Sequence, residues 1–196
     1  MITETIWFNP KYLNTRRQLA VFADRDGTLI QHVDYIEDPA QVELLPGVKK
    51  AVRRLISNQI PFFILTNQSG VGRGYFGIEN VHACQERLFE LLEILPEEVA
   101  GWCIAPETPG TEGGYRKPSP RFIEEACQHL GIAPMQCHMI GDTLVDLKTA
   151  WNAGVRAWAV ACGKPELPKQ IHAGGLGGEY ALEADFGACV DAIMTA

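Results

Sequence analysis

Short apolar runs alternate with longer helix-like segments along most of this chain, and this alternation limits the folds open to it. Five runs have the length of strands and are apolar at most positions: 19–23, 61–65, 101–105, 138–140 and 157–161. Strands that are apolar on both faces are typical of parallel sheets covered by helices. The helix-like segments span 47–58, 78–95, 119–130, 145–153 and 188–194. The pattern predicts βαβ units in an α/β, Rossmann-like, doubly wound parallel sheet.

Local signals set the expected limits of these elements. The helix over 119–130 is expected to take Ser119 as its N-cap, with Pro120 in the first turn, and to end before Gly131. Residues 1–18 are expected to form an N-terminal extension, and 19–196 a single domain. The stretch 163–180 is rich in Gly and Pro and predicts a loop.

Composition and charge exclude several classes of protein. The 196 residues include 17 Lys and Arg against 24 Asp and Glu, a net charge of −7 with no basic block, which argues against a nucleic-acid partner. No apolar stretch has the length of a membrane helix, and the N-terminus lacks the pattern of a signal peptide. We therefore expect a cytoplasmic monomer with no membrane partner. The six cysteines form no C-x-x-C pair, which predicts reduced and mostly buried thiols.

Acidic side chains follow two of the predicted strands. Asp24 and Asp26 come directly after the first, and Asp142 and Asp146 follow the fourth. Ligands of open parallel sheets bind at the carboxyl ends of strands, so we expect these carboxylates to lie near one rim. Carboxylates crowded together repel one another unless a cation offsets their charge. An all-oxygen set without His or Cys favours Mg²⁺ over zinc.

A hydroxyl and an ammonium group stand at neighbouring positions. Thr66 follows the second predicted strand, and Lys117 precedes the third predicted helix. Beside a metal ion, these groups indicate a docked phosphoryl group. With the acidic residues they make an ordered set that closely resembles the four motifs of the haloacid dehalogenase superfamily of phosphohydrolases over about residues 19–161. The motifs are Asp24-x-Asp26-Gly27-Thr28, Thr66, Lys117 and Gly141-Asp142-x-x-x-Asp146.

This resemblance implies a mechanism. Asp24 would attack phosphorus and form an aspartyl phosphate, which water then hydrolyses, and Asp26 would serve as acid and then as base. Thr66 would donate a hydrogen bond to a phosphoryl oxygen, and Lys117 would neutralise charge in the transition state. Mg²⁺ would be held by Asp24, Asp142 and the backbone carbonyl of Asp26. Asp146 is expected to hold Lys117 or the metal shell in place.

A finer resemblance lies in residues 66–76, which read Thr-Asn-Gln-Ser-Gly-Val-Gly-Arg-Gly-Tyr-Phe, and in Arg116-Lys117-Pro118. Both are similar to the D-glycero-D-manno-heptose 1,7-bisphosphate 7-phosphatases and their histidinol-phosphatase relatives. The resemblance implies a Mg²⁺-dependent phosphatase acting on a small phosphorylated sugar, with heptose bisphosphate the first candidate. The substrate-binding residues it implies are Arg25, His32, Tyr35, Asn67, Gln68, Ser69, Arg73 and Arg116.

The chain also departs from this family. Many members carry a zinc-binding loop between a Cys-x-His and a Cys-x-Cys sequence, where this chain has Cys103-Ile104-Ala105 and Gly113-Gly114-Tyr115. One cysteine cannot hold a tetrahedral zinc, so we expect no structural zinc, and a loop over 106–115 ordered by packing and turns or else mobile. Thr143 stands where the heptose enzymes usually have a lysine, which weakens the case for a bisphosphate. The linkers between motifs are too short for a cap domain, so an open, capless site is expected.

Three alternatives stay open at this point. Histidinol-phosphate phosphatases share the motifs. Polynucleotide 3′-phosphatases use a similar Asp-x-Asp-Gly-Thr and Thr-Asn-Gln pattern, but the acidic net charge argues against them. A catalytically silent binding or scaffold protein on the same fold is the third, because fold alone does not establish activity.

Overall fold

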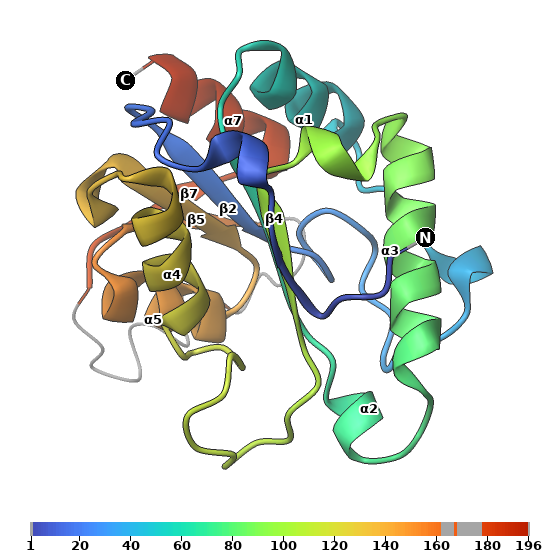
Figure 1. The fold of residues 1–196 in the computed structure, drawn as a ribbon. Coiled ribbons are helices and arrows are strands. Elements are labelled where there is room, and N and C mark those ends of the chain that lie inside the picture. The colour runs from blue at the N-terminus through green and yellow to red at the C-terminus, as the bar shows by residue number, and fades with distance from the viewer. Residues whose placement is uncertain (1, 162–166, 168–177, 196) are drawn as a thin grey trace.

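A seven-stranded sheet forms the centre of the part of the chain that the computed structural model describes, residues 2–161, 167 and 178–195 (Figure 1). Its strands are β1 Ile6–Phe8, β2 Ala20–Asp24, β3 Phe62–Asn67, β4 Gly101–Ala105, β5 Cys137–Gly141, β6 Arg156–Val160 and β7 Tyr180–Glu183. Their spatial order is β1-β4-β3-β2-β5-β6-β7, and every pair is parallel except β1 with β4. The predicted α/β doubly wound sheet is confirmed.

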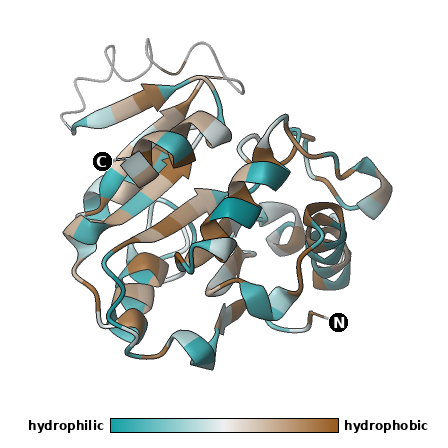
Figure 2. Ribbon diagram, turned by 90° about the horizontal axis from the view of Figure 1, so that it is seen from above, coloured by the Kyte–Doolittle hydropathy of each residue, from teal (hydrophilic) through white to brown (hydrophobic). Residues whose placement is uncertain are grey.

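Helices cover both faces of this sheet. They are α1 Val48–Ser57, α3 Ile78–Leu92, α4 Arg121–Leu130, α5 Leu144–Ala153 and α7 Phe186–Thr195. The short α2 Ser69–Gly72 lies at one end of the molecule instead (Figure 1). The buried apolar side chains of α1, α3 and α7 pack on one face, and those of α4 and α5 on the other. Hydrophobic colours follow the strands in Figure 2, while hydrophilic colours lie on the outer surfaces of the helices. Two apolar cores therefore hold the sheet between them.

The strand order places a switch point at the middle of the sheet. From β2 the chain runs outward through β3 and β4, and it then returns to β5 on the other side of β2. Loops at the carboxyl ends of β2 and β5 therefore diverge, which is where open α/β sheets bind ligands. Residues 25–47, 68–77 and 106–120, all of them described, contain loops, two isolated β-bridges, a 3-10 turn at Pro39–Gln41 and the short α2, so the predicted capless arrangement is confirmed.

The limits of two helices differ from prediction. The assigned cap position of α4 is Pro120, one residue later than predicted, while the Ser119 hydroxyl still accepts from the Arg121 amide at 3.4 Å in the first turn. The predicted helix over 78–95 ends earlier, at Leu92. Glu93 has a φ of 55°, a left-handed conformation that cannot continue a right-handed helix.

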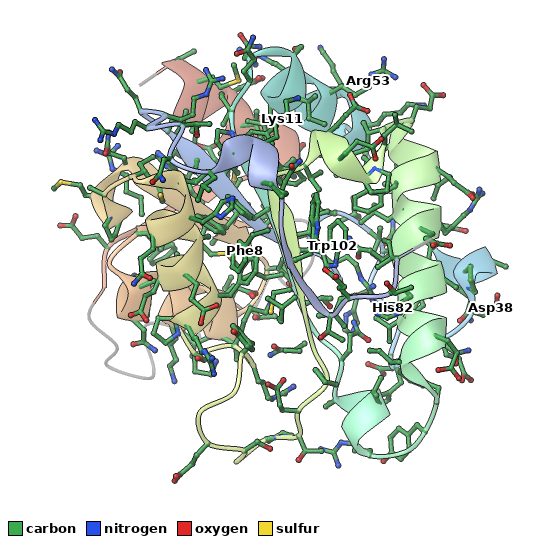
Figure 3. The ribbon with its side chains drawn as sticks, viewed as in Figure 1. Phe8, Lys11, Asp38, Arg53, His82 and Trp102 are labelled. Atoms are coloured by element: carbon green, nitrogen blue, oxygen red, sulfur yellow. The ribbon has the colours of Figure 1, made fainter. Side chains whose placement is uncertain are left out.

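The N-terminal segment is part of the sheet rather than an appendage. Trp7 in β1 lies opposite Trp102 in β4, and the two indoles stack with their ring centroids 4.4 Å apart. Phe8 stacks on Phe122 of α4 at 4.9 Å. Figure 3 shows Phe8 on the α4 side of the sheet and Trp102 on the α3 side. Alternate residues of this segment therefore complete both cores, and β1 belongs to the same sheet as the domain predicted over 19–196.

The opposite edge carries a strand that the sequence did not predict. β7 pairs parallel with β6, and its four residues are half-buried or exposed, so they lack the continuous apolar pattern of the central strands. Most of the loop predicted over 163–180 lies outside the described residues. Cys84, Cys103, Cys127 and Cys137 are buried free thiols, as predicted; Cys189 is also buried, and Cys162 lies outside the described residues. None of the helices in the described ranges is long and apolar enough to cross a membrane.

Candidate active site

The four predicted motifs meet in one pocket. Asp24 is the last residue of β2, Thr66 lies near the end of β3, and Asp142 directly follows β5. Lys117 arrives from the loop before α4. The residues that line the pocket are Asp24, Asp26, His32, Thr66, Asn67, Lys117, Asp142, Thr143, Val145 and Asp146. Every residue predicted to act in catalysis or to bind metal is among them.

Lys117 is the buried cation of this pocket. Its amine donates to Asp24 Oδ1 and, at 2.6 Å, to Asp146 Oδ1. Burial lowers the pKa of Lys117, but attraction to Asp146 and Asp24 and the hydrogen bonds to both outweigh burial, so the pKa lies above its ordinary value. Lys117 therefore remains charged, and the expectation that Asp146 holds it in place is confirmed.

Asn67 fixes the backbone of Lys117. Its Oδ1 accepts from the Lys117 amide at 2.9 Å, and its Nδ2 donates to the Lys117 carbonyl at 3.1 Å. Thr143 fixes the other partner, since its amide and hydroxyl both donate to Asp146 Oδ2, at 3.0 and 2.5 Å. Both oxygens of Asp146 therefore accept hydrogen bonds: Oδ1 accepts from Lys117, and Oδ2 accepts from Thr143 at the start of α5.

Three carboxylates crowd together beside this network. Ligand oxygens of Asp24, Asp142 and Asp146 all lie within 4.8 Å of one another, and the three residues are buried. Burial raises the pKa of Asp24 well above its ordinary value; Lys117 lowers it, and Asp146, Asp142 and Asp26 raise it further. Such a cluster is stabilised when a divalent cation offsets its charge, and its oxygen donors suit Mg²⁺.

A glycine makes room for this cluster. Gly27 has a φ of +98°, and a Cβ there would lie 2.4 Å from Asp142 Oδ2. A side chain at this position would therefore displace Asp142 as well as strain the turn. The turn after β2 is thus shaped to let the Asp142 carboxylate approach the backbone that follows Asp24.

Asp26 occupies a separate part of the pocket. Its Oδ2 accepts from the Thr66 hydroxyl at 2.7 Å and from Gln68 Nε2 at 3.0 Å. Arg25 donates from Nε to Oδ2 and from Nη2 to Oδ1, both at 3.1 Å. Burial raises the pKa of Asp26, but Arg25, Thr66 and Lys117 together outweigh it, so the pKa is lowered. The two carboxyl groups predicted to share the chemistry, Asp24 and Asp26, thus have pKa values shifted in opposite directions.

Most of the predicted substrate-binding residues line or border an adjoining pocket. It is lined by Asp26, His32, Val33, Asp34, Tyr35, Ile36, Asn67, Gln68, Ser69 and Gly70. Arg116 lies close by: burial lowers its pKa, Glu107 raises it, and the nearby Arg73 lowers it. Arg73 and Arg116 are therefore near enough to influence each other, and Arg116 directly precedes the pocket residue Lys117.

Arg25 requires a correction. It was predicted to touch substrate, yet its side chain has no exposed surface and its guanidinium faces Asp26.

The sequence analysis missed an aromatic residue at the site. Tyr75 packs edge-on against Tyr35, with ring centroids 5.0 Å apart, and both rings are about half exposed at the rim of the site. Tyr75 belongs to the run 66–76 that carried the resemblance, so that motif was the available signal.

The loop over 106–115 is held by hydrogen bonds. Glu107 Oε1 accepts from the Tyr115 amide at 2.8 Å, and the Tyr115 hydroxyl donates to Glu125 at 2.9 Å. Arg121 lies over the Tyr115 ring and donates to the Gly113 carbonyl at 2.8 Å. Of the two outcomes expected for this loop, order through packing and turns is the one observed. Figure 1 shows the loop and α2 at the same end of the molecule, where the Gly72 amide donates to the Pro106 carbonyl.

Comparisons with known proteins agree with these motifs. The family model of haloacid dehalogenase-like hydrolases matches residues 7–154. A D-glycero-D-manno-heptose-1,7-bisphosphate 7-phosphatase of Thermosynechococcus vestitus is 37% identical over 148 residues, 69% of this chain and 74% of that protein. A D-glycero-beta-D-manno-heptose-1,7-bisphosphate 7-phosphatase of Haemophilus ducreyi is 35% identical over 144 residues, 70% of this chain and 79% of that protein.

A solved structure is similar over nearly the whole fold. The D,D-heptose 1,7-bisphosphate phosphatase of B. bronchiseptica, complexed with magnesium and phosphate, superimposes with a TM-score of 0.80 at 26% identity. The match covers 90% of this chain and 98% of that protein. The arrangement of sheet, helices and site loops described above is therefore one that known proteins share.

Proposed function

The chain belongs to the haloacid dehalogenase-like hydrolases and is a phosphatase. From this premise we propose that it removes the 7-phosphate of D-glycero-D-manno-heptose 1,7-bisphosphate with the help of Mg²⁺. The observation that carries the proposal is the convergence of Asp24, Asp26, Lys117 and Asp142 in one pocket. Relatives that are 33 to 37% identical and carry this activity by name support the choice of substrate. A cytoplasmic monomer remains the expected form of the enzyme.

Two carboxyl groups divide the chemistry. Asp24 attacks phosphorus, and the bond from phosphorus to the sugar oxygen breaks as that oxygen takes a proton from Asp26. An anionic phosphoryl group in the pocket raises the pKa of the neighbouring Asp26, which lets it carry that proton. In the second half, Asp26 removes a proton from water, the water oxygen attacks phosphorus, and the bond to Asp24 breaks to release phosphate.

The remaining polar groups bind and orient the phosphoryl group. The Thr66 hydroxyl, which donates to Asp26 in the free protein, can turn to a phosphoryl oxygen, and Lys117 offsets the charge that develops there. Mg²⁺ would be held by Asp24, Asp142 and the backbone carbonyl of Asp26, and when bound it supplies positive charge between an anionic nucleophile and an anionic phosphate. The crowded carboxylates fit such an ion, and the absence of a side chain at Gly27 leaves room for Asp142 to join them.

The adjoining pocket is proposed to hold the sugar and its second phosphate. His32, Tyr35 and Ser69 line it, and Arg73 and Arg116 supply positive charge at its rim. Gln68 and Asn67 contribute indirectly, since the first donates to Asp26 and the second fixes Lys117. Two arginines at this rim are the cations available to the second phosphate where Thr143 replaces the usual lysine.

The test is phosphate release from three substrates with Mg²⁺: heptose 1,7-bisphosphate, histidinol phosphate and a 3′-phosphorylated oligonucleotide. We expect turnover of the bisphosphate to exceed that of the other two, and Asp24→Asn to abolish it. Asp191→Asn is the matched control, because Asp191 is an exposed aspartate that pairs with Arg54 away from the pocket. Faster turnover of histidinol phosphate would reassign the substrate, and turnover that survives Asp24→Asn would overturn the mechanism.

A further inference from the structure

Arg25 is a fully buried arginine that is directed at a single carboxylate. It lies between Asp24 and Asp26 in the turn after β2, and its guanidinium donates to both oxygens of Asp26 in a forked arrangement. Two hydrogen bonds from a planar donor fix the plane of the carboxyl group as well as its position. No surface of the side chain reaches the pocket.

Packing alone does not account for this residue. Removing a guanidinium from water carries a large cost, which a buried apolar side chain would avoid. The Nη1 atom of Arg25 is buried without a hydrogen-bond partner among the described residues, so no hydrogen bond there offsets the cost of desolvation. The hydrogen bonds observed for the Arg25 side chain all go to Asp26. We therefore expect Arg25 to act on Asp26.

The hydrogen bonds of Asp26 are distributed unevenly between its two oxygens. Oδ2 accepts from the Thr66 hydroxyl, Gln68 Nε2 and Arg25 Nε, which fills its acceptor positions. Oδ1 accepts from Arg25 Nη2, the single hydrogen bond to this atom within the described ranges. An ionised carboxylate offers about two acceptor positions on each oxygen. Oδ1 is therefore the atom with room for a proton, and Arg25 sets its direction.

We propose that Arg25 is a positioning residue, whose guanidinium holds the Asp26 carboxyl group in the plane from which Oδ1 delivers its proton to the leaving oxygen. This inference rests on the proposed function. The bond from phosphorus to the leaving oxygen breaks with its electron pair on that oxygen, which takes the proton from Asp26, and Arg25 keeps all its protons. The assignment replaces the predicted contact of Arg25 with substrate.

The reaction allows a measurement that would not change if Arg25 had only a structural role. A poor leaving group, such as the oxygen of a sugar phosphate, needs the proton, whereas the nitrophenolate of 4-nitrophenyl phosphate leaves without it. Arg25→Met should lower kcat on the sugar phosphate by about 10- to 100-fold, a fraction of the ~10²–10⁴-fold that an acid contributes. The loss on 4-nitrophenyl phosphate should be much smaller. Arg25→Lys keeps a buried charge without the fork, so its loss should be intermediate and equally selective.

A double-mutant cycle with Asp26→Asn separates the possible outcomes. If Arg25 acts through Asp26, Arg25→Met should cost nothing further once Asp26 is Asn. Arg87→Met is the matched control, since Arg87 is partly exposed on α3 and pairs with Glu90. Equal losses on both substrates, or additive losses in the double variant, would overturn the inference and leave the proposed function standing. If Asp26→Asn itself spares the sugar phosphate, the acid assignment in the proposed function fails and the inference fails with it. Arg25→Lys gives the same comparison should Arg25→Met not fold.

Discussion

The amine of Lys117 lies 2.6 Å from Asp146 Oδ1, and the side chains of both residues are at most 5% exposed. Asp146 also caps the start of α5 through Thr143, so the helix and the lysine share one carboxylate. Asp146→Asn keeps the shape but removes the charge. We expect kcat to fall by about 10- to 100-fold, as for other partners that orient a site residue. Steady-state phosphate release would measure this, with the free energy of unfolding measured in parallel.

The control for this change is Asp191→Asn. Asp191 is an exposed aspartate whose ion pair with Arg54 lies on the surface, where such pairs contribute about 0–1 kcal/mol. Its replacement should leave both activity and stability nearly unchanged. If Asp146→Asn behaved like this control, Lys117 would owe its position to Asp24 and the backbone alone.

Gly27 offers a second prediction, because a side chain there meets Asp142. Gly27→Ala places a Cβ about where Asp142 Oδ2 now lies, at a separation of 2.4 Å, in a backbone conformation with φ +98°. We expect the Mg²⁺ concentration for half-maximal activity to rise by about tenfold or more, since displacing Asp142, a proposed ligand, should cost at least as much as the loss of a contact that orients a ligand. A Mg²⁺ titration of phosphate release would measure the shift.

Gly47→Ala isolates backbone strain from the displacement of Asp142. Gly47 also has a positive φ, +79°, but a Cβ there meets nothing within 4 Å. It should destabilise the fold by about 1–3 kcal/mol, the usual cost of such strain, and leave the Mg²⁺ requirement unchanged. Equal Mg²⁺ requirements in the two variants would show that Gly27 serves the turn and not the metal site.

The sequence predicted the catalytic part of the site because its residues stand at the ends of strongly apolar strands. Asp24 and Thr66 lie at the carboxyl ends of β2 and β3, and Asp142 directly follows β5. Parallel strands bring their carboxyl ends to one edge whatever the exact register. The prediction needed only the order of elements. For the same reason, errors of a few residues in the limits of α3 and α4 did not disturb it.

The parts that were missed depend on tertiary contacts. β1 is three residues long and gains its place by pairing with β4 and stacking Trp7 on Trp102, which no local pattern reveals. Arg25 sits in a polar motif and reads as a surface cation, yet the fold buries it against Asp26. Charge in a motif predicts that a residue matters to the site, but not whether it faces the substrate or another side chain.

Removing the divalent cation should weaken the fold as well as stop the reaction. Without it, the Asp24 and Asp142 carboxylates lie close together in the buried site, where burial and repulsion raise the pKa of Asp24 although Lys117 lowers it. An ion that binds only the folded state stabilises it by about 2.7 kcal/mol at one hundred times its dissociation constant. We expect Mg²⁺ to raise the Tm of EDTA-treated protein and to restore its activity. Asp142→Asn should abolish the rise in Tm, and a rise that persists in this variant would place the ion elsewhere.

Acid should destabilise the protein in part through His138 in β5. His138 is buried, its Nδ1 accepts from Trp158 Nε1 at 2.8 Å, and burial, with Arg156 nearby, lowers its pKa from 6.5 to about 4. Above about pH 6.5 the imidazole is neutral in both states and contributes no pH dependence. As the pH falls from 6.5 to about 4, His138 binds a proton in the unfolded chain but not in the folded chain, so the free energy of unfolding decreases.

His138→Asn keeps an acceptor for Trp158 but cannot titrate, so the free energy of unfolding of this variant should fall less steeply over this range. Urea unfolding at pH 7, 6, 5 and 4.5 would compare the slopes, and parallel curves for the two proteins would show that other groups cause the loss.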